Sequence, residues 1–121
     1  MPPAQRTPER PSIPVDAGSQ VVIVGRLGSA VTQRELPSGD TVTVFTIIVD
    51  RPARASSYGS RVRVDAIPCQ AFRVTVARRL TSLEPGQWVR AEGRLRRRFW
   101  RSGAGLGSAL EVEVSSVQPC R

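Results

Sequence analysis

Hydrophobic and polar residues alternate along five short segments of this chain, which is the pattern of strands that bury one face. The segments are rich in β-branched residues and are separated by residues typical of turns. They are Val21–Leu27, Thr41–Val49, Val62–Phe72, Trp88–Trp100 and Ala109–Val117. In the second segment Phe45, Ile47 and Val49 share one parity, which predicts that they are buried. The pattern predicts an all-β fold, either a small barrel or a sandwich.

One stretch between the third and fourth segments has a helical pattern instead. Val74–Leu83 carries apolar residues at helical spacing and is followed by Pro85 and Gly86, which end helices. Three strands, one short helix and two further strands follow one another in a five-stranded OB-fold barrel. We therefore predict this barrel over residues 20–121, preceded by a disordered, proline-rich leader over residues 1–19.

Three connections have the composition of loops. Pro37–Asp40 (PSGD) predicts a turn, because Pro fixes one φ and Gly tolerates a positive φ. Residues 51–60 are predicted to form a long basic loop, and residues 102–107 (SGAGLG) a flexible tip. No Gly-Lys-Ser/Thr follows these glycines, so they do not form a nucleotide-binding loop.

The charge of the chain indicates what kind of partner it could bind. The net charge is +8 and every basic residue is arginine. A guanidinium group can bind phosphate with two hydrogen bonds and stack on a base, which an ammonium group cannot do. So large a basic excess in a small domain favours a polyanionic partner such as nucleic acid. A generally cationic, solvated surface explains the same excess, so charge alone leaves both interpretations open.

The composition argues against catalysis and metal binding. The chain lacks histidine, the commonest general base, and Cys69 and Cys120 stand far apart, so zinc ligands are missing. Cys69 lies in an apolar run and is predicted to be a core residue. No apolar run approaches about 18 residues and no secretory signal is present, which predicts a cytoplasmic protein without membrane contact. We expect no enzymatic activity, no metal and no cofactor.

The segment Trp88–Arg101 carries the most informative pattern. With a period of two, one face holds Val89, Ala91, Gly93, Leu95 and Phe99, which predicts core residues. The other face holds Trp88, Arg90, Glu92, Arg94, Arg96, Arg98 and Trp100. Arg97 breaks the alternation, so a bulge or a strand end is expected near it.

This row of arginines ending in an indole suits single-stranded nucleic acid. Cations follow the phosphates, and a ring stacks on a base of any sequence. A duplex hides its base faces and offers little to an outward ring. The alternative is a solvated strand face, with Trp100 packed on a neighbouring strand or subunit.

Further candidate DNA-binding residues lie outside this segment. Phe72 has the opposite parity to Cys69 and Ala71, which places it outside the core, although a lone Phe is usually buried, and Arg73 follows it. Tyr58 is an aromatic residue in a basic loop that could fold over a bound strand, and a disordered hairpin tip is the alternative. The complete further set is Phe72, Arg73, Arg26, Arg51, Tyr58, Arg61 and Arg63.

Four segments, in this order, resemble the bacterial single-stranded DNA-binding proteins: VVIVGRL, LPSGDTVTVFTIIV, DAIPCQAF and LEPGQWVRAEGRLRRRFW. The resemblance covers about residues 20–118. It implies an OB fold that binds single-stranded DNA without catalysis, in replication, repair or recombination. It also implies a homotetramer, with a dimer left open. Phe72 and Trp100 fall where the family keeps stacking aromatics, and Arg96 and Arg98 fall at basic positions.

The chain departs from the family pattern at two stacking aromatic positions and at its C-terminal residues. Ala53 and Ala66 stand where the family keeps two stacking aromatics, which predicts weaker and more salt-sensitive binding. Val117–Arg121 is basic, whereas the housekeeping members end in an acidic tip that recruits repair proteins. We therefore expect a nucleoid-associated accessory paralogue that lacks the recruiting tail.

Two other functions remain open at this stage. A tailless OB-fold module of the primosomal replication-restart type would serve mainly protein assembly, and the outward apolar residues Ile48 and Trp88 fit such a surface. RNA binding in the manner of cold-shock barrels is the other, although the aromatic-rich strands of those domains are absent.

Overall fold

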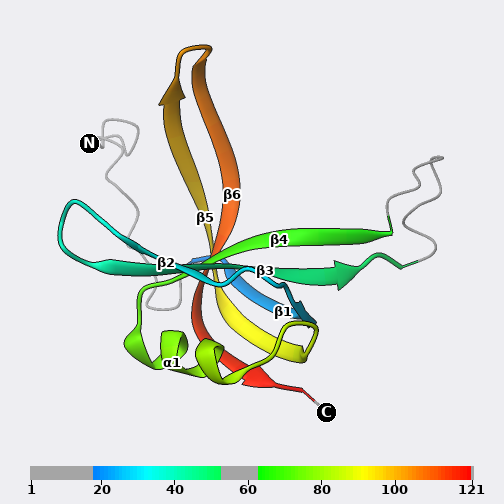
Figure 1. Cartoon of the computed structure of the whole chain (residues 1–121). Helices are drawn as coiled ribbons and strands as arrows, with labels where there is room; N and C mark the ends of the chain where they lie inside the picture. Colours follow the sequence, from blue (N-terminus) through cyan, green and yellow to red (C-terminus); the bar gives the residue numbers. More distant parts are fainter. Residues whose placement is uncertain (1–17, 53–62, 121) are drawn as a thin grey trace, which may run out of the picture.

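A computed structural model describes residues 18–52 and 63–120 of the chain. Its elements are β1 (Gln20–Leu27), β2 (Thr32–Glu35), β3 (Thr41–Asp50), β4 (Val64–Ala71), α1 (Val74–Ser82), β5 (Trp88–Ser102) and β6 (Gly105–Pro119). The strands form one sheet in the order β1-β5-β6-β4-β3-β2, and β1 also pairs with β3, which closes the sheet into a barrel (Figure 1). The proposed leader up to residue 17 and the loop residues Tyr58 and Arg61 lie outside the described residues.

Alternate residues of the barrel strands supply most of the core, although β3 also buries Val42 of the opposite parity and β2 buries no residue. Phe45 and Ile47 are almost completely buried, as the alternation in their strand predicts, whereas Val49, of the same parity, is only half-buried near the end of the strand. α1 closes one end of the barrel through Val76 and Leu80, and its bounds agree with the predicted helix to within one residue. Cys69 is a core residue, as predicted, and burial raises the pKa of its thiol to about 12, so the thiol stays protonated at neutral pH.

The structure contains a sixth strand, β2, beyond the five that the alternation predicts. Its residues (TQRE) are all exposed, so no apolar pattern marks them. β2 pairs antiparallel with β3 from Thr32↔Val44 to Glu35↔Thr41. The two strands are joined by the predicted turn, in which Gly39 has a φ of 92°.

β5 and β6 continue beyond the barrel as a two-stranded hairpin (Figure 1). Their pairing runs without interruption to Ser102↔Gly105. The predicted bounds of the tip, residues 102–107, are therefore wrong, because most of that segment is strand and only Gly103 and Ala104 lie between the two strands.

The prediction that Leu95 and Phe99 are core residues is also wrong. Both keep the parity of the buried Val89 and Ala91, but the pairing of β1 with β5 ends at Gln20↔Arg94. Beyond that point no barrel encloses the inward face of β5. The side chains are therefore in solvent, with Leu95 45% and Phe99 68% exposed.

The irregularity of this hairpin lies at Gly93 and not near Arg97. Glu92 pairs with Ser116 and Gly93 with Val114, so Ser115 is an extra residue in β6. A bulge of this kind bends the strands, and here it lies where the hairpin leaves the barrel. A Cβ atom at Gly93 would lie 2.0 Å from the carbonyl oxygen of Glu113, so only glycine fits.

We predict that Gly93→Ala lowers the free energy of unfolding by about 1–3 kcal/mol, because the new methyl group forces the two backbones apart. Urea denaturation measures the loss. Gly103→Ala is the control, since a Cβ atom there meets nothing within 4 Å. Equal urea midpoints for Gly93→Ala and Gly103→Ala would show that the bulge can accommodate a side chain at position 93.

Candidate nucleic-acid interface

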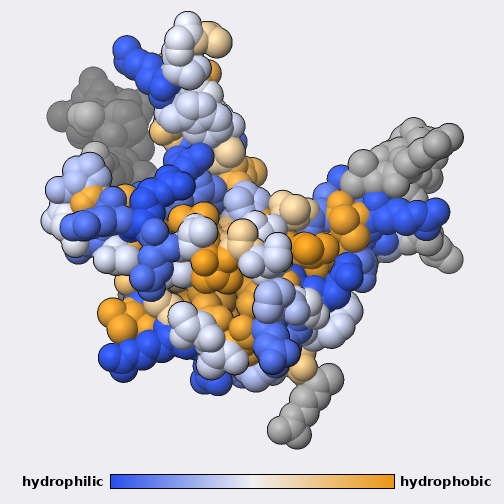
Figure 2. Space-filling model, in the orientation of Figure 1, coloured by the Kyte–Doolittle hydropathy of each residue, from blue (hydrophilic) through white to orange (hydrophobic). Residues whose placement is uncertain are grey.

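The arginines of β5 lie on the outer face of the hairpin, as the alternation predicts. Arg94, Arg96 and Arg98 share this face with Trp100, and their side chains are 68%, 53% and 49% exposed. Figure 2 shows hydrophilic residues gathered where the hairpin leaves the barrel, beside hydrophobic residues on the barrel surface.

Two glutamates of β6 face this row and neutralise part of its charge. Arg94 and Arg96 lie 3.2 Å and 3.6 Å from the carboxylate of Glu113. Arg98 lies 2.8 Å from the carboxylate of Glu111, which is nearly buried. Three guanidinium groups thus face two carboxylates. The alternation along β5 could not show these partners, because they come from another strand and depend on the register.

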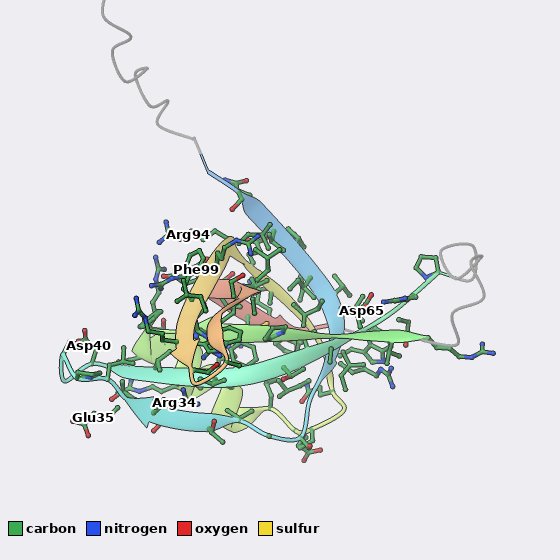
Figure 3. The ribbon with its side chains drawn as sticks, turned by 90° about the horizontal axis from the view of Figure 1, so that it is seen from above. Arg34, Glu35, Asp40, Asp65, Arg94 and Phe99 are labelled. Atoms are coloured by element: carbon green, nitrogen blue, oxygen red, sulfur yellow. The ribbon has the colours of Figure 1, made fainter. Side chains whose placement is uncertain are left out.

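A groove of about 400 Å³ lies between the hairpin and the β2–β3 side of the barrel. Among the predicted residues it is lined by Phe72, Arg96 and Arg98. Arg34 of β2 lines it as well, although sequence analysis missed it because nothing marks β2 as a strand. In Figure 3, which looks down on the hairpin, Arg34, Arg94 and Phe99 lie on the same side of the view.

Phe72 lies at a junction of three hollows. It is exposed at the end of β4, as predicted, and it lines the groove described above. It also lines a hollow of about 380 Å³ with Arg73 and Arg94, and another of about 290 Å³ with Arg73 and Arg78 of α1. The guanidinium carbon of Arg96 lies 5.8 Å from the centre of the Phe72 ring. Phe72 is therefore an exposed ring surrounded by cations.

Trp100 lies flat against the backbone of β6. Its cross-strand partner is Gly107, and a Cβ atom at Gly107 would lie 2.5 Å from the indole ring. Arg98 holds its guanidinium carbon 5.2 Å from the centre of that ring. Trp100 is 41% exposed, so its indole is available at the surface.

Arg26, Arg51 and Arg63 are not brought into the groove. Arg26 forms an ion pair of 2.9 Å with Asp50, and Arg51 one of 2.7 Å with Asp65. The hydrogen bond from Arg51, with a smaller contribution from its charge, holds the pKa of Asp65 below its usual value. Arg63 is exposed and directly precedes β4. Arg51 and Arg63 lie where β3 ends and β4 begins, and Arg26 of β1 lies close to that end of β3 through its ion pair with Asp50.

Residues 18–52 and 63–120 contain no cluster of three or more His, Cys, Asp or Glu side chains able to hold a metal ion. That part of the chain also contains no helix of the length and apolarity required to cross a membrane.

We predict that Gly107→Ala displaces the Trp100 indole, because the new methyl group would overlap the ring. In a Trp88→Phe background the emission of Trp100 should change in wavelength or in quenching by acrylamide. Gly103→Ala in the same background should leave the emission unchanged. An unaltered Gly107→Ala spectrum would mean that the ring does not rest on β6.

The single-strand binding protein family matches residues 19–120. The single-stranded DNA-binding protein of Thermotoga maritima is 34% identical over 104 residues, which cover 82% of this chain and 70% of that protein. Single-stranded DNA-binding protein 1 of Staphylococcus aureus is 34% identical over 101 residues, 83% of this chain and 59% of the relative. This chain thus spans about three fifths of the staphylococcal protein.

Solved structures confirm the predicted fold. The Plasmodium falciparum SSB in complex with single-stranded DNA aligns with a TM-score of 0.72 at 16% identity, over 90% of this chain and all of that chain. The mitochondrial single-stranded DNA-binding protein Rim1 of S. cerevisiae aligns with a TM-score of 0.65 at 19% identity, over 85% and 95% of the two chains. Since the family match also spans nearly every described residue, the chain belongs to the single-strand binding protein family.

Proposed function

We propose that this protein binds single-stranded DNA without sequence preference, in replication, repair or recombination. The observation that carries this proposal is the outer face of the hairpin, where three arginines and Trp100 stand beside a groove that also exposes Phe72. Cations neutralise phosphates and exposed rings stack on unpaired bases, and both requirements are met on one face. A duplex would satisfy only the first of them.

Binding requires the ion pairs of the free protein to open. A phosphate that approaches Arg94 or Arg96 competes with the carboxylate of Glu113. These arginine side chains are more than half exposed, so the pairs are solvated and each is worth at most about 1 kcal/mol. Bases then stack on Phe72 and Trp100. Arg34, in the groove, and Arg73, in the adjoining hollow, are placed to bind the neighbouring phosphates. The glutamates moderate the affinity without blocking the site.

Assembly into a homotetramer is the form we propose for the working protein, with a dimer as the alternative. Light scattering of the free protein distinguishes the two masses. Single-stranded DNA is its proposed partner.

A second candidate function is protein assembly of the primosomal type. The observation in its favour is the outer face of β1 and β5, where Val22, Val24 and Trp88 are about half exposed. The double variant Phe72→Ala/Trp100→Ala separates the two functions. A large loss of DNA affinity supports DNA binding, whereas unchanged weak affinity together with recovery of a helicase-loading partner supports assembly.

We predict that Arg96→Ala weakens binding to oligo-dT and reduces the salt dependence. Loss of one phosphate contact should reduce the log–log salt slope by about 0.7. Fluorescence titration at several salt concentrations measures both quantities. The control is Arg90→Ala. Arg90 is also exposed on β5 and also forms an ion pair, with Glu92, but it lies in the part of β5 that pairs with β1 and does not line the groove. Failure of the wild-type protein to bind at low salt would refute the proposed function itself.

We predict that Glu113→Gln strengthens binding by about 1.5- to 5-fold, since it removes the carboxylate that competes for Arg94 and Arg96. Glu84→Gln makes the same change in net charge on the connection between α1 and β5 and should have a smaller effect. The same titration gives the ratio. Weaker binding by Glu113→Gln would instead mean that this carboxylate holds the arginines in their binding positions.

A further inference from the structure

Phe99 is the most exposed aromatic side chain among the residues that the structure describes. It is 68% exposed, compared with 37% for Phe72 and 41% for Trp100. Its cross-strand partner is Ser108, which is too small to cover a phenyl ring. Exposure of a large apolar side chain is unfavourable in water and is typical of residues that contact a partner.

The ring of Phe99 also differs from the other exposed rings in its surroundings. Arg96 lies over Phe72, Arg98 over Trp100 and Arg26 over Trp88, each with its guanidinium carbon within 6 Å of the ring centre. Within the described ranges no guanidinium lies over Phe99. A base could therefore stack on this ring without first displacing a cation.

Phe99 belongs to the same groove as the proposed DNA contacts. Although its parity is opposite to that of Trp100, it lines the groove of about 400 Å³ together with Phe72, Arg97 and Arg98. Arg97 donates a hydrogen bond of 3.1 Å to Ser108, the cross-strand partner of Phe99. A positive charge is thereby held next to the ring, where a phosphate flanking a stacked base would lie.

The charges on this face of the hairpin favour a nucleic acid over a second copy of the chain. The face carries Arg97 and Arg101 beside Leu106 and Leu110, and the register places no carboxylate on it between Leu95 and Leu106. Two copies packed here would bring like charges together. A DNA strand supplies phosphates to the arginines and a base to the ring.

We propose that Phe99 is a base-stacking residue of the groove. It adds a ring on the face of the hairpin opposite Trp100, so that a bound strand contacts both faces. This inference rests on the proposed function and names a contact that neither the alternation of residues nor the family pattern assigned.

The test compares Phe99→Ala with the wild-type protein on two ligands of equal length, oligo-dT and an abasic deoxyribose-phosphate oligomer. Loss of one stacking contact should weaken oligo-dT binding by about 5- to 150-fold. Binding of the abasic oligomer should be unchanged, because it offers no base. Arg96→Ala should weaken binding to both ligands. Phe99→Tyr should restore oligo-dT affinity, since it keeps the ring.

Leu106→Ala is the matched control, since Leu106 is equally apolar, is on the same face and is 74% exposed. It should leave oligo-dT affinity unchanged. Equal affinity of wild type and Phe99→Ala for oligo-dT overturns this inference while the proposed function stands. Absence of binding by the wild type refutes the proposed function. A change of mass in light scattering, without a change in oligo-dT affinity, overturns the inference in favour of a protein contact.

Discussion

The pairing of β5 with β6 is the interaction on which the surface of this protein depends. The two strands pair from Val89↔Pro119 to Ser102↔Gly105, while β1 accompanies β5 only to Arg94. An isolated two-stranded ribbon is marginally stable in water. This one is stable because its base belongs to the barrel, where Val112 and Val114 are buried. The free part of the ribbon therefore exposes both of its faces, and it stands away from β2 and β3 to leave a groove.

Arginine–glutamate pairing allows this ribbon to carry so many like charges. The spacing of two residues places Arg94, Arg96 and Arg98 side by side on one strand, where they repel one another. Glu111 and Glu113, on the adjacent strand, lie between them and offset that repulsion. Each pair is weak because it is solvated, except for the nearly buried carboxylate of Glu111. The result is a surface that is folded in the absence of a ligand and still retains positive charge.

The sequence predicts the features that depend on local periodicity. The burial of Phe45, Ile47 and Cys69, the bounds of α1 and the outward position of Phe72 all agree with the structure. Periodicity also indicated the outward position of Trp100, whereas the stacking role of Phe72 came from the resemblance to a family.

The features that could not be predicted depend on pairing between distant segments. Leu95 and Phe99 follow the parity of core residues, and only the end of β1 shows that nothing covers them. Arg34 reaches the groove through a strand without an apolar residue. Gly107 resembles a flexible glycine until the register places it beneath the indole of Trp100. Alternation identifies the residues that share a face, but the sheet order decides what lies against that face.

The position of Phe72 has a consequence for the directions in which a bound strand could run. Hollows extend from this ring toward the hairpin and also toward α1, where Arg78 lies. A polynucleotide laid across Phe72 would meet cationic hollows on two sides of this ring, one bordered by the hairpin arginines and the other by Arg73 and Arg78. The ring would then act as a branch point between two surfaces of one rigid barrel.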